Sequence, residues 1–85
     1  MTPPADDDKR RLFLVTAHDT PDALMRVLAV AGVGRARLRA LTARPEGGDL
    51  AIRLEIDDPG EFRAQALAAR LAACTLVRSV GFGWR

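Results

Sequence analysis

The chain has little of what builds covalent cross-links or reactive sites. Its 85 residues include one cysteine, one histidine, one lysine and no tyrosine. The single thiol of Cys74 cannot form an internal disulfide, and one thiol with one imidazole is too few ligands for the usual structural zinc sites. We therefore expect no metal site and a fold held by apolar packing. A hydrophobic content of 48% is enough for one small domain.

Long apolar runs are also missing. No stretch is long enough to span a bilayer, and no hydrophobic segment follows the charges of the first eleven residues, as a signal peptide would require. A lone cysteine is compatible with a reducing compartment. Together these features predict a cytoplasmic protein with no membrane partner.

The charge pattern is modest, with a formal net charge of +2. Residues 1–10 contain two prolines and three consecutive acids, which predicts a disordered leader before a single domain at 11–85. The basic residues are almost all arginine, which we attribute to nucleotide bias in the source genome rather than to nucleic-acid binding.

Residues 11–17 read as a strand with apolar side chains on both faces. This pattern predicts a central strand that is covered on both sides, or covered on one side and buried in a subunit contact on the other. A helix start follows. Thr20 fits the N-cap, Pro21 the first helical position and Asp22 the positive end of the helix dipole. The predicted helix ends near Gly32 and has the apolar stripe Leu24, Val27, Leu28 and Ala31.

Residues 34–42 and 50–56 alternate with the period of half-buried strands, and the composition of 44–49 predicts a turn between them. The first of these strands would present a face made of Arg35, Arg37 and Arg39. The second would turn four aliphatic side chains inward: Leu50, Ile52, Leu54 and Ile56.

A second helix is predicted from Asp58, as its cap, to about residue 73. Pro59 would take the first position, and Glu61 would complete a capping box. Its expected apolar stripe is Phe62, Ala66, Leu67 and Leu71. A last strand at 75–82 would place Leu76, Val80 and Phe82 on one side and Val77 on the other, before the tail 83–85.

The order strand, helix, strand, strand, helix, strand predicts an α+β ferredoxin-like βαββαβ sandwich. Its four-stranded antiparallel sheet would carry both helices on one face, since each crossover is right-handed. The first and third strands would be central.

The run Asp19-Thr20-Pro21-Asp22-Ala23-Leu24 resembles the start of an ACT domain, and the resemblance extends over residues 11–82. In that family an Asn or Asp ends the first strand and x-Pro-Gly-x-Leu opens the helix. The phrases P-D-A-L-M-R-V-L-A-V and D-L-A-I-R-L-E-I are most similar to the short regulatory subunit of acetolactate synthase.

The resemblance implies an effector site at the first strand–helix turn, usually across a dimer contact. An amino acid would place its carboxylate at the helix N-terminus, and Asp19 would pair its ammonium group. Asp22, however, stands where the family has Gly, and its carboxylate would repel that of the ligand. The candidate effector-binding residues are His18, Asp19, Thr20, Pro21, Asp22, Ala23 and Leu24. His18 also has a structural interpretation as a turn residue, and Asp19 and Asp22 as helix-start residues.

The resemblance further implies a non-catalytic regulatory subunit that dimerises and docks on the catalytic subunit of acetolactate synthase in branched-chain amino-acid synthesis. A branched-chain amino acid is the possible effector, and no cofactor is expected. Arg35, Arg37, Arg39 and Trp84 are candidate partner-surface residues, although edge arginines also prevent uncontrolled strand pairing.

Three alternatives stay open: a stand-alone amino-acid sensor, a small enzyme using His18, and an RNA-binding domain. RNA binding is disfavoured because Phe13 is the lone stacking candidate on a central strand.

Overall fold

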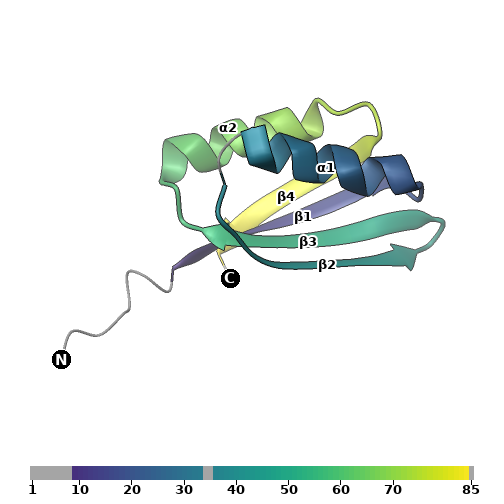
Figure 1. The fold of residues 1–85 in the computed structure, drawn as a ribbon, viewed down its shortest axis with the longest axis horizontal. Helices are drawn as coiled ribbons and strands as arrows, with labels where there is room; N and C mark the ends of the chain where they lie inside the picture. The colour runs from purple at the N-terminus through teal and green to yellow at the C-terminus, as the bar shows by residue number, and fades with distance from the viewer. Residues whose placement is uncertain (1–8, 34–35, 85) are drawn as a thin grey trace.

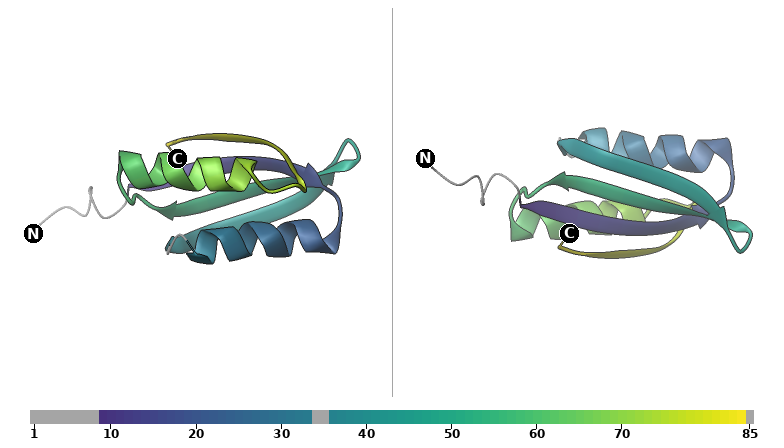
Figure 2. Two further views of the ribbon diagram at one scale, coloured as in Figure 1. Left: turned by 90° about the horizontal axis from the view of Figure 1, so that it is seen from above. Right: turned by 90° about the horizontal axis from the view of Figure 1, so that it is seen from below.

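The computed structural model describes residues 9–33 and 36–84, which form one sheet and two helices (Figure 1). The elements are β1 (Arg10–His18), α1 (Pro21–Val33), β2 (Leu38–Glu46), β3 (Asp49–Asp57), α2 (Glu61–Ala72) and β4 (Val77–Trp84). The strand order is β2-β3-β1-β4, and every neighbouring pair is antiparallel. Both helices lie on one face of the sheet, and the view from below shows the other face bare (Figure 2). The predicted ferredoxin-like topology is confirmed.

The core lies between this helical layer and the two central strands. Alternate residues of β1 and β3 point toward the helices, as the two-residue period of a strand requires. Small and medium apolar side chains of both helices pack against them. The core cluster consists of Phe13, Val15, Ala17, Ala23, Val27, Leu50, Ile52, Leu54, Ile56, Ala64, Leu67 and Leu71.

The predicted pair of strands is confirmed, but the first strand lies four residues later in the sequence than predicted. β2 begins at Leu38 and runs to Glu46, so residues 44–46 belong to the strand and only Gly47 and Gly48 turn, both with positive φ. Pro45 is tolerated because β2 is an edge strand, where a missing N–H can face outward. An irregularity between Leu38 and Ala40 breaks the alternation on which the arginine face was predicted.

The predicted start of the second helix is wrong. α2 begins at Glu61 after Gly60, whose φ of 97° favours glycine, and no side chain caps it. Asp58 Oδ1 instead accepts the Gly60 N–H at 3.0 Å, which makes a turn ahead of the helix. The apolar stripe is also rotated. Ala64, Leu67 and Leu71 are buried, whereas Phe62 is 85% exposed and Ala66 is exposed.

The chain ends differ from expectation as well. Arg10, predicted in the leader, pairs in β1, and residues 1–8 lie outside the described residues. β4 runs from Val77 to Trp84, so Trp84 is part of the sheet and not of a tail. A register shift in the β1–β4 pairing puts Val77 opposite Ala17, so Val77 packs on the core side with Val80. Helix α1 continues through Gly32 to Val33.

A buried arginine ties three of these elements together. Arg11, only 4% exposed, donates from Nε to Asp58 at 3.1 Å and from a terminal nitrogen to Glu61 at 2.6 Å. Its guanidinium carbon lies 3.8 Å from the centre of the Trp84 ring, a cation–π contact. The Arg11 bond holds the pKa of Glu61 below its ordinary value. The pKa of Asp58 is lowered first by the Gly60 N–H and then by Arg11.

We expect the free energy of unfolding to decrease in acid because of this cluster. Both carboxyl pKa values are lowered in the fold, so the stabilisation is complete above the ordinary carboxyl range and is lost as the pH falls through the lowered values. The substitution Glu61→Gln should reduce the acid dependence. Urea unfolding from about pH 7 to about pH 3, followed by Trp84 fluorescence, measures it.

Glu46→Gln is the matched control, since Glu46 forms only a 3.7 Å contact with exposed Arg44. Equal acid dependence in the Glu61→Gln and Glu46→Gln variants would contradict the assignment.

Candidate functional site at the first strand–helix corner

The corner is built by the end of β1 and the start of α1. The His18 N–H donates to Leu76 O at 2.9 Å, which fixes the strand end against the segment before β4. The Thr20 N–H donates to His18 O at 2.9 Å and turns the chain. Thr20 Oγ1 then accepts the N–H of Ala23 at 3.3 Å. The predicted N-cap, with Pro21 at the first helical position, is confirmed.

The candidate effector residues divide between surface and core. His18 is half-buried, and the four that follow it are exposed: Asp19, Thr20, Pro21 and Asp22. Ala23 is 0% exposed and belongs to the core, and Leu24 packs partly buried against it. A ligand at this corner could therefore reach the side chains of residues 18–22 but not that of Ala23.

The first turn of α1 has little capacity left for an anion. Pro21 has no N–H, and the N–H of Ala23 is already bound by Thr20. The N–H of Asp22 remains, with the exposed Asp22 carboxylate beside it. A helix N-terminus attracts negative charge through its free N–H groups and dipole. Here one donor is absent, one is occupied, and a fixed carboxylate stands next to the third.

Two hollows of the described part of the chain lie away from this corner. One groove of about 470 Å³ lies between the C-terminal end of α1 and α2. A broader depression of about 650 Å³ lies on the helix-free face of the sheet, around Leu14 and Thr42. Both are formed by residues other than 18–24. In the single chain, residues 19–22 are exposed at this corner.

The described residues show neither a metal-ligand cluster nor a hydrogen bond to the side chain of His18. Across 9–33 and 36–84, no three His, Cys, Asp or Glu side chains group so as to hold an ion. The His18 side chain has no hydrogen-bond partner in that same range. Neither described helix is long and apolar enough to cross a membrane.

The candidate partner-surface residues do not form one surface. Arg35 lies outside the described residues, and exposed Arg37 precedes β2. Arg39 donates from two nitrogens to the Asp57 carboxylate, both at 2.7 Å, which raises the pKa of Arg39 and lowers that of Asp57. Trp84, 54% exposed, lies on β4 at the opposite edge of the sheet.

Phe13, the only stacking candidate for RNA, is unavailable. It is 0% exposed, points toward the helices and stacks on Phe82 with ring centroids 5.6 Å apart. Single-stranded RNA is read by aromatic rings exposed on a sheet. The helix-free face of this sheet has instead the aliphatic Leu14, the small residues Ala51 and Gly81, and charged residues.

Two features were not predicted from the sequence. Arg11 lies on the same face of β1 as the buried residues Phe13, Val15 and Ala17. A charged residue on the buried face of a strand indicates a buried ion pair, so this feature could have been predicted. The groove beside α2 was missed because Phe62 was assigned to the core.

Comparisons with known proteins agree on the fold. The sequence matches no protein-family model and no curated protein. Among solved structures, the ACT domain of GTP pyrophosphokinase from Chlorobium tepidum superposes with a TM-score of 0.76 at 14% identity, covering 87% of this chain and 96% of that one. The C-terminal domain of MgtC from Mycobacterium tuberculosis gives 0.74 at 18% identity, covering 91% and 87%.

A third structure, homoserine dehydrogenase from Thiobacillus denitrificans, gives a TM-score of 0.75 at 16% identity. The match covers 89% of this chain but only 17% of the enzyme, so the similarity is to one small part of a larger protein. At these identities the likeness establishes the fold. This chain has the ferredoxin-like fold seen in ACT domains, as the resemblance implied.

The Thr20 cap gives a direct test of the corner. Thr20→Ala removes the side-chain acceptor for the Ala23 N–H, which keeps its 3.2 Å bond to Thr20 O, and should reduce the free energy of unfolding by about 1 kcal/mol. Thr20→Ser keeps a hydroxyl and should lose much less. Chemical denaturation of both variants measures the difference, and equal losses would show that the hydroxyl does not cap the helix.

Proposed function

We propose that this chain is a non-catalytic regulatory subunit of the ACT type, which acts by binding another protein. The observation that carries the proposal is the fold, which matches a separately determined ACT domain over 96% of that domain's length.

The partner we propose is the catalytic subunit of acetolactate synthase, in branched-chain amino-acid synthesis. Support comes from the resemblance of residues 21–30 and 49–56 to its short regulatory subunit. The conformation of residues 18–24 supports an effector-type corner in which Thr20 caps α1. The exposed Asp22 carboxylate supports reduced or lost binding of an amino acid. Because allosteric coupling requires differential ligand binding, feedback by that ligand would also be weak.

Complex formation tests the choice of partner. A tagged copy of the chain should co-purify with the acetolactate synthase catalytic subunit from the same organism. Arg37→Glu, at the exposed entry to β2, should weaken the complex if that edge docks. Arg26→Glu is the matched control, an exposed arginine on α1 outside the candidate surface. Failure to form any complex rejects this partner.

The role of Asp22 has its own test. The unmodified chain should show no micromolar binding of valine, leucine or isoleucine by calorimetry, because its carboxylate opposes that of the ligand. Asp22→Gly removes the charge and allows close approach to the N–H of residue 22, so binding should strengthen by at least tenfold for one of the three.

Met25→Gly is the control, since Met25 is also exposed on α1 but lies beyond its first turn. Micromolar binding by the unmodified chain would refute the proposed loss of sensing.

We also propose that the chain forms a homodimer through the helix-free face of the sheet. Leu14, on central strand β1, is 51% exposed there. Its cross-strand neighbours are Arg53 on β3 and Gly81 on β4. An apolar side chain on the uncovered face of a central strand supports the subunit contact expected from the sequence.

Leu14→Glu should convert the dimer to a monomer. The new carboxylate can pair with Arg53 within one chain, so the fold should tolerate it, while a dimer contact would have to bury the charge. Sedimentation should show a mass near 9.2 kDa for the variant and near twice that for the unmodified chain. Met25→Glu, a charge placed at an exposed α1 residue, should stay dimeric. A monomeric unmodified chain would exclude this interface.

A further inference from the structure

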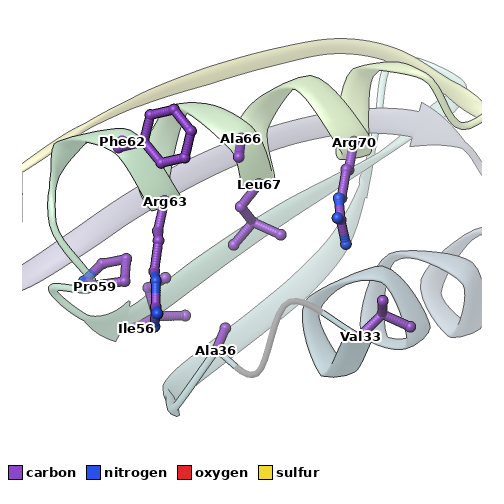
Figure 3. Close-up of a pocket in the computed structure, with 9 residues that line it drawn as sticks. All are labelled: Val33, Ala36, Ile56, Pro59, Phe62, Arg63, Ala66, Leu67 and Arg70. Carbon is purple, nitrogen blue, oxygen red and sulfur yellow. The ribbon is translucent and has the colours of Figure 1, made fainter.

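The groove between α1 and α2 is an apolar surface left uncovered by the described residues (Figure 3). Buried Ile56 and Leu67, 0% and 5% exposed, form its floor. Val33 from the end of α1 and Phe62 from the start of α2 line it, yet they are 71% and 85% exposed. These are two of the most exposed large apolar side chains of the molecule.

Two arginines give the groove a positive charge. Arg63 and Arg70 both extend from α2 toward the side of the groove that Val33 and Ala36 form (Figure 3). Within residues 9–33 and 36–84 neither guanidinium has an ion-pair partner, although seven other contacts pair acids with arginines there. The groove therefore suits an acidic segment with apolar residues. A second copy placing its own α2 here would bring like charges together.

The described chain begins beside this groove. The N–H of Asp58 donates to Lys9 O at 3.2 Å, and the next residue, Pro59, lines the groove. Lys9 is preceded directly by Asp6, Asp7 and Asp8, the only run of three acids in the sequence. Before them stand Met1, Thr2, Pro3, Pro4 and Ala5, which are largely apolar. The segment that precedes Lys9 is thus acidic, as the basic groove requires, and it is attached at the end of that groove.

The length of this segment is also sufficient. Eight residues span about 25 Å when extended, at roughly 3.1–3.6 Å per residue. The helix from Glu61 to Arg70 is about 14 Å long at 1.5 Å per residue. Residues 1–8 of the leader can therefore reach past both arginines from their attachment at Lys9.

We propose that residues 1–8 lie in the groove of their own chain. Asp6–Asp8 pair with Arg63 and Arg70, and the proline-containing end beyond them covers Val33, which lies on the Arg70 side of the groove (Figure 3). Exposed ion pairs are weak and screened by salt, so the leader is displaceable. Any acidic partner segment that uses this groove must compete with it. The inference does not depend on the partner proposed above.

A spin label on the leader tests the proposal in the full chain. The label is attached at Ala5→Cys in a Cys74→Ser background, and broadening of amide NMR signals is recorded. The signals of Phe62 to Arg70 and of Val33 should lose at least half of their intensity. In Arg63→Gln/Arg70→Gln, or with Asp6–Asp8 changed to Asn, most of that intensity should return. Arg26→Gln, an exposed arginine outside the groove, should leave the broadening unchanged.

The variants separate docking from mere tethering. If the broadening in the Arg63→Gln/Arg70→Gln variant equals that in the chain with both arginines, the leader is near the groove only because it is attached there. That result would overturn the proposal. A second sample mixes two forms of the chain, one isotope-labelled without a spin label and one spin-labelled without isotope. Broadening in this sample can come only from the leader of a second copy. Broadening of equal size in that sample would also overturn the intramolecular arrangement.

Discussion

The buried guanidinium of Arg11 is the interaction on which the arrangement of this small fold depends. It lies at the start of β1 and contacts the turn before α2, the first residue of α2 and the end of β4. A charge buried on the core phase of a strand is costly unless it is fully paired, so Asp58, Glu61 and Trp84 have to be in place when β1 is. The burial and pairing of the Arg11 side chain thereby join the first strand and the last strand to the second helix.

This constraint also shapes the surfaces available for function. Because Arg11 draws the start of α2 down to β1 and β4, the other flank of that helix, with Phe62 and Arg63, is left facing the groove. The same contact region places Lys9 beside Asp58 at the groove's end. On the opposite side of the sheet no helix covers Leu14. The described part of the molecule thus has an exposed apolar side chain on each side of its sheet, Phe62 in the helical layer and Leu14 on the helix-free face.

The first strand–helix corner shows how structural and functional demands compete for the same atoms. Thr20 satisfies the N–H of Ala23, and Pro21 removes another donor, so the helix start is stable without a ligand. Asp22 adds a favourable charge to the helix dipole. In the proposed function, the features that stabilise this helix start are the same ones that oppose the binding of a ligand carboxylate.

Much of the fold could be predicted from local patterns. The two-residue period of residues 50–56 and the Thr20-Pro21 start depend on neighbours in sequence, and both are confirmed. The errors arose where contacts between residues far apart in the sequence determine the local structure. Asp58 resembled a cap locally, but its carboxylate is bound by Arg11, 47 positions away. The shifted register of β2 and the position of Val77 depend on irregular pairing with neighbouring strands.

For the candidate site, the sequence could predict the segment that forms it but not which of its side chains are exposed. The positions of His18 to Leu24 follow from the strand–helix order, but the burial of Ala23 depends on how α1 is rotated on the sheet. Phe62 was assigned to the core because its spacing fits a helical stripe. In the structure α2 is rotated so that Glu61 binds Arg11 and Phe62 is exposed instead.

The central claim is that this chain acts through the activity of another protein. The most direct measurement is the steady-state rate of the acetolactate synthase catalytic subunit, titrated with the purified chain in the presence and absence of valine. The account predicts a saturable change in rate on adding the chain, with little further change on adding valine. A rate that stays the same at all concentrations of the chain would contradict it.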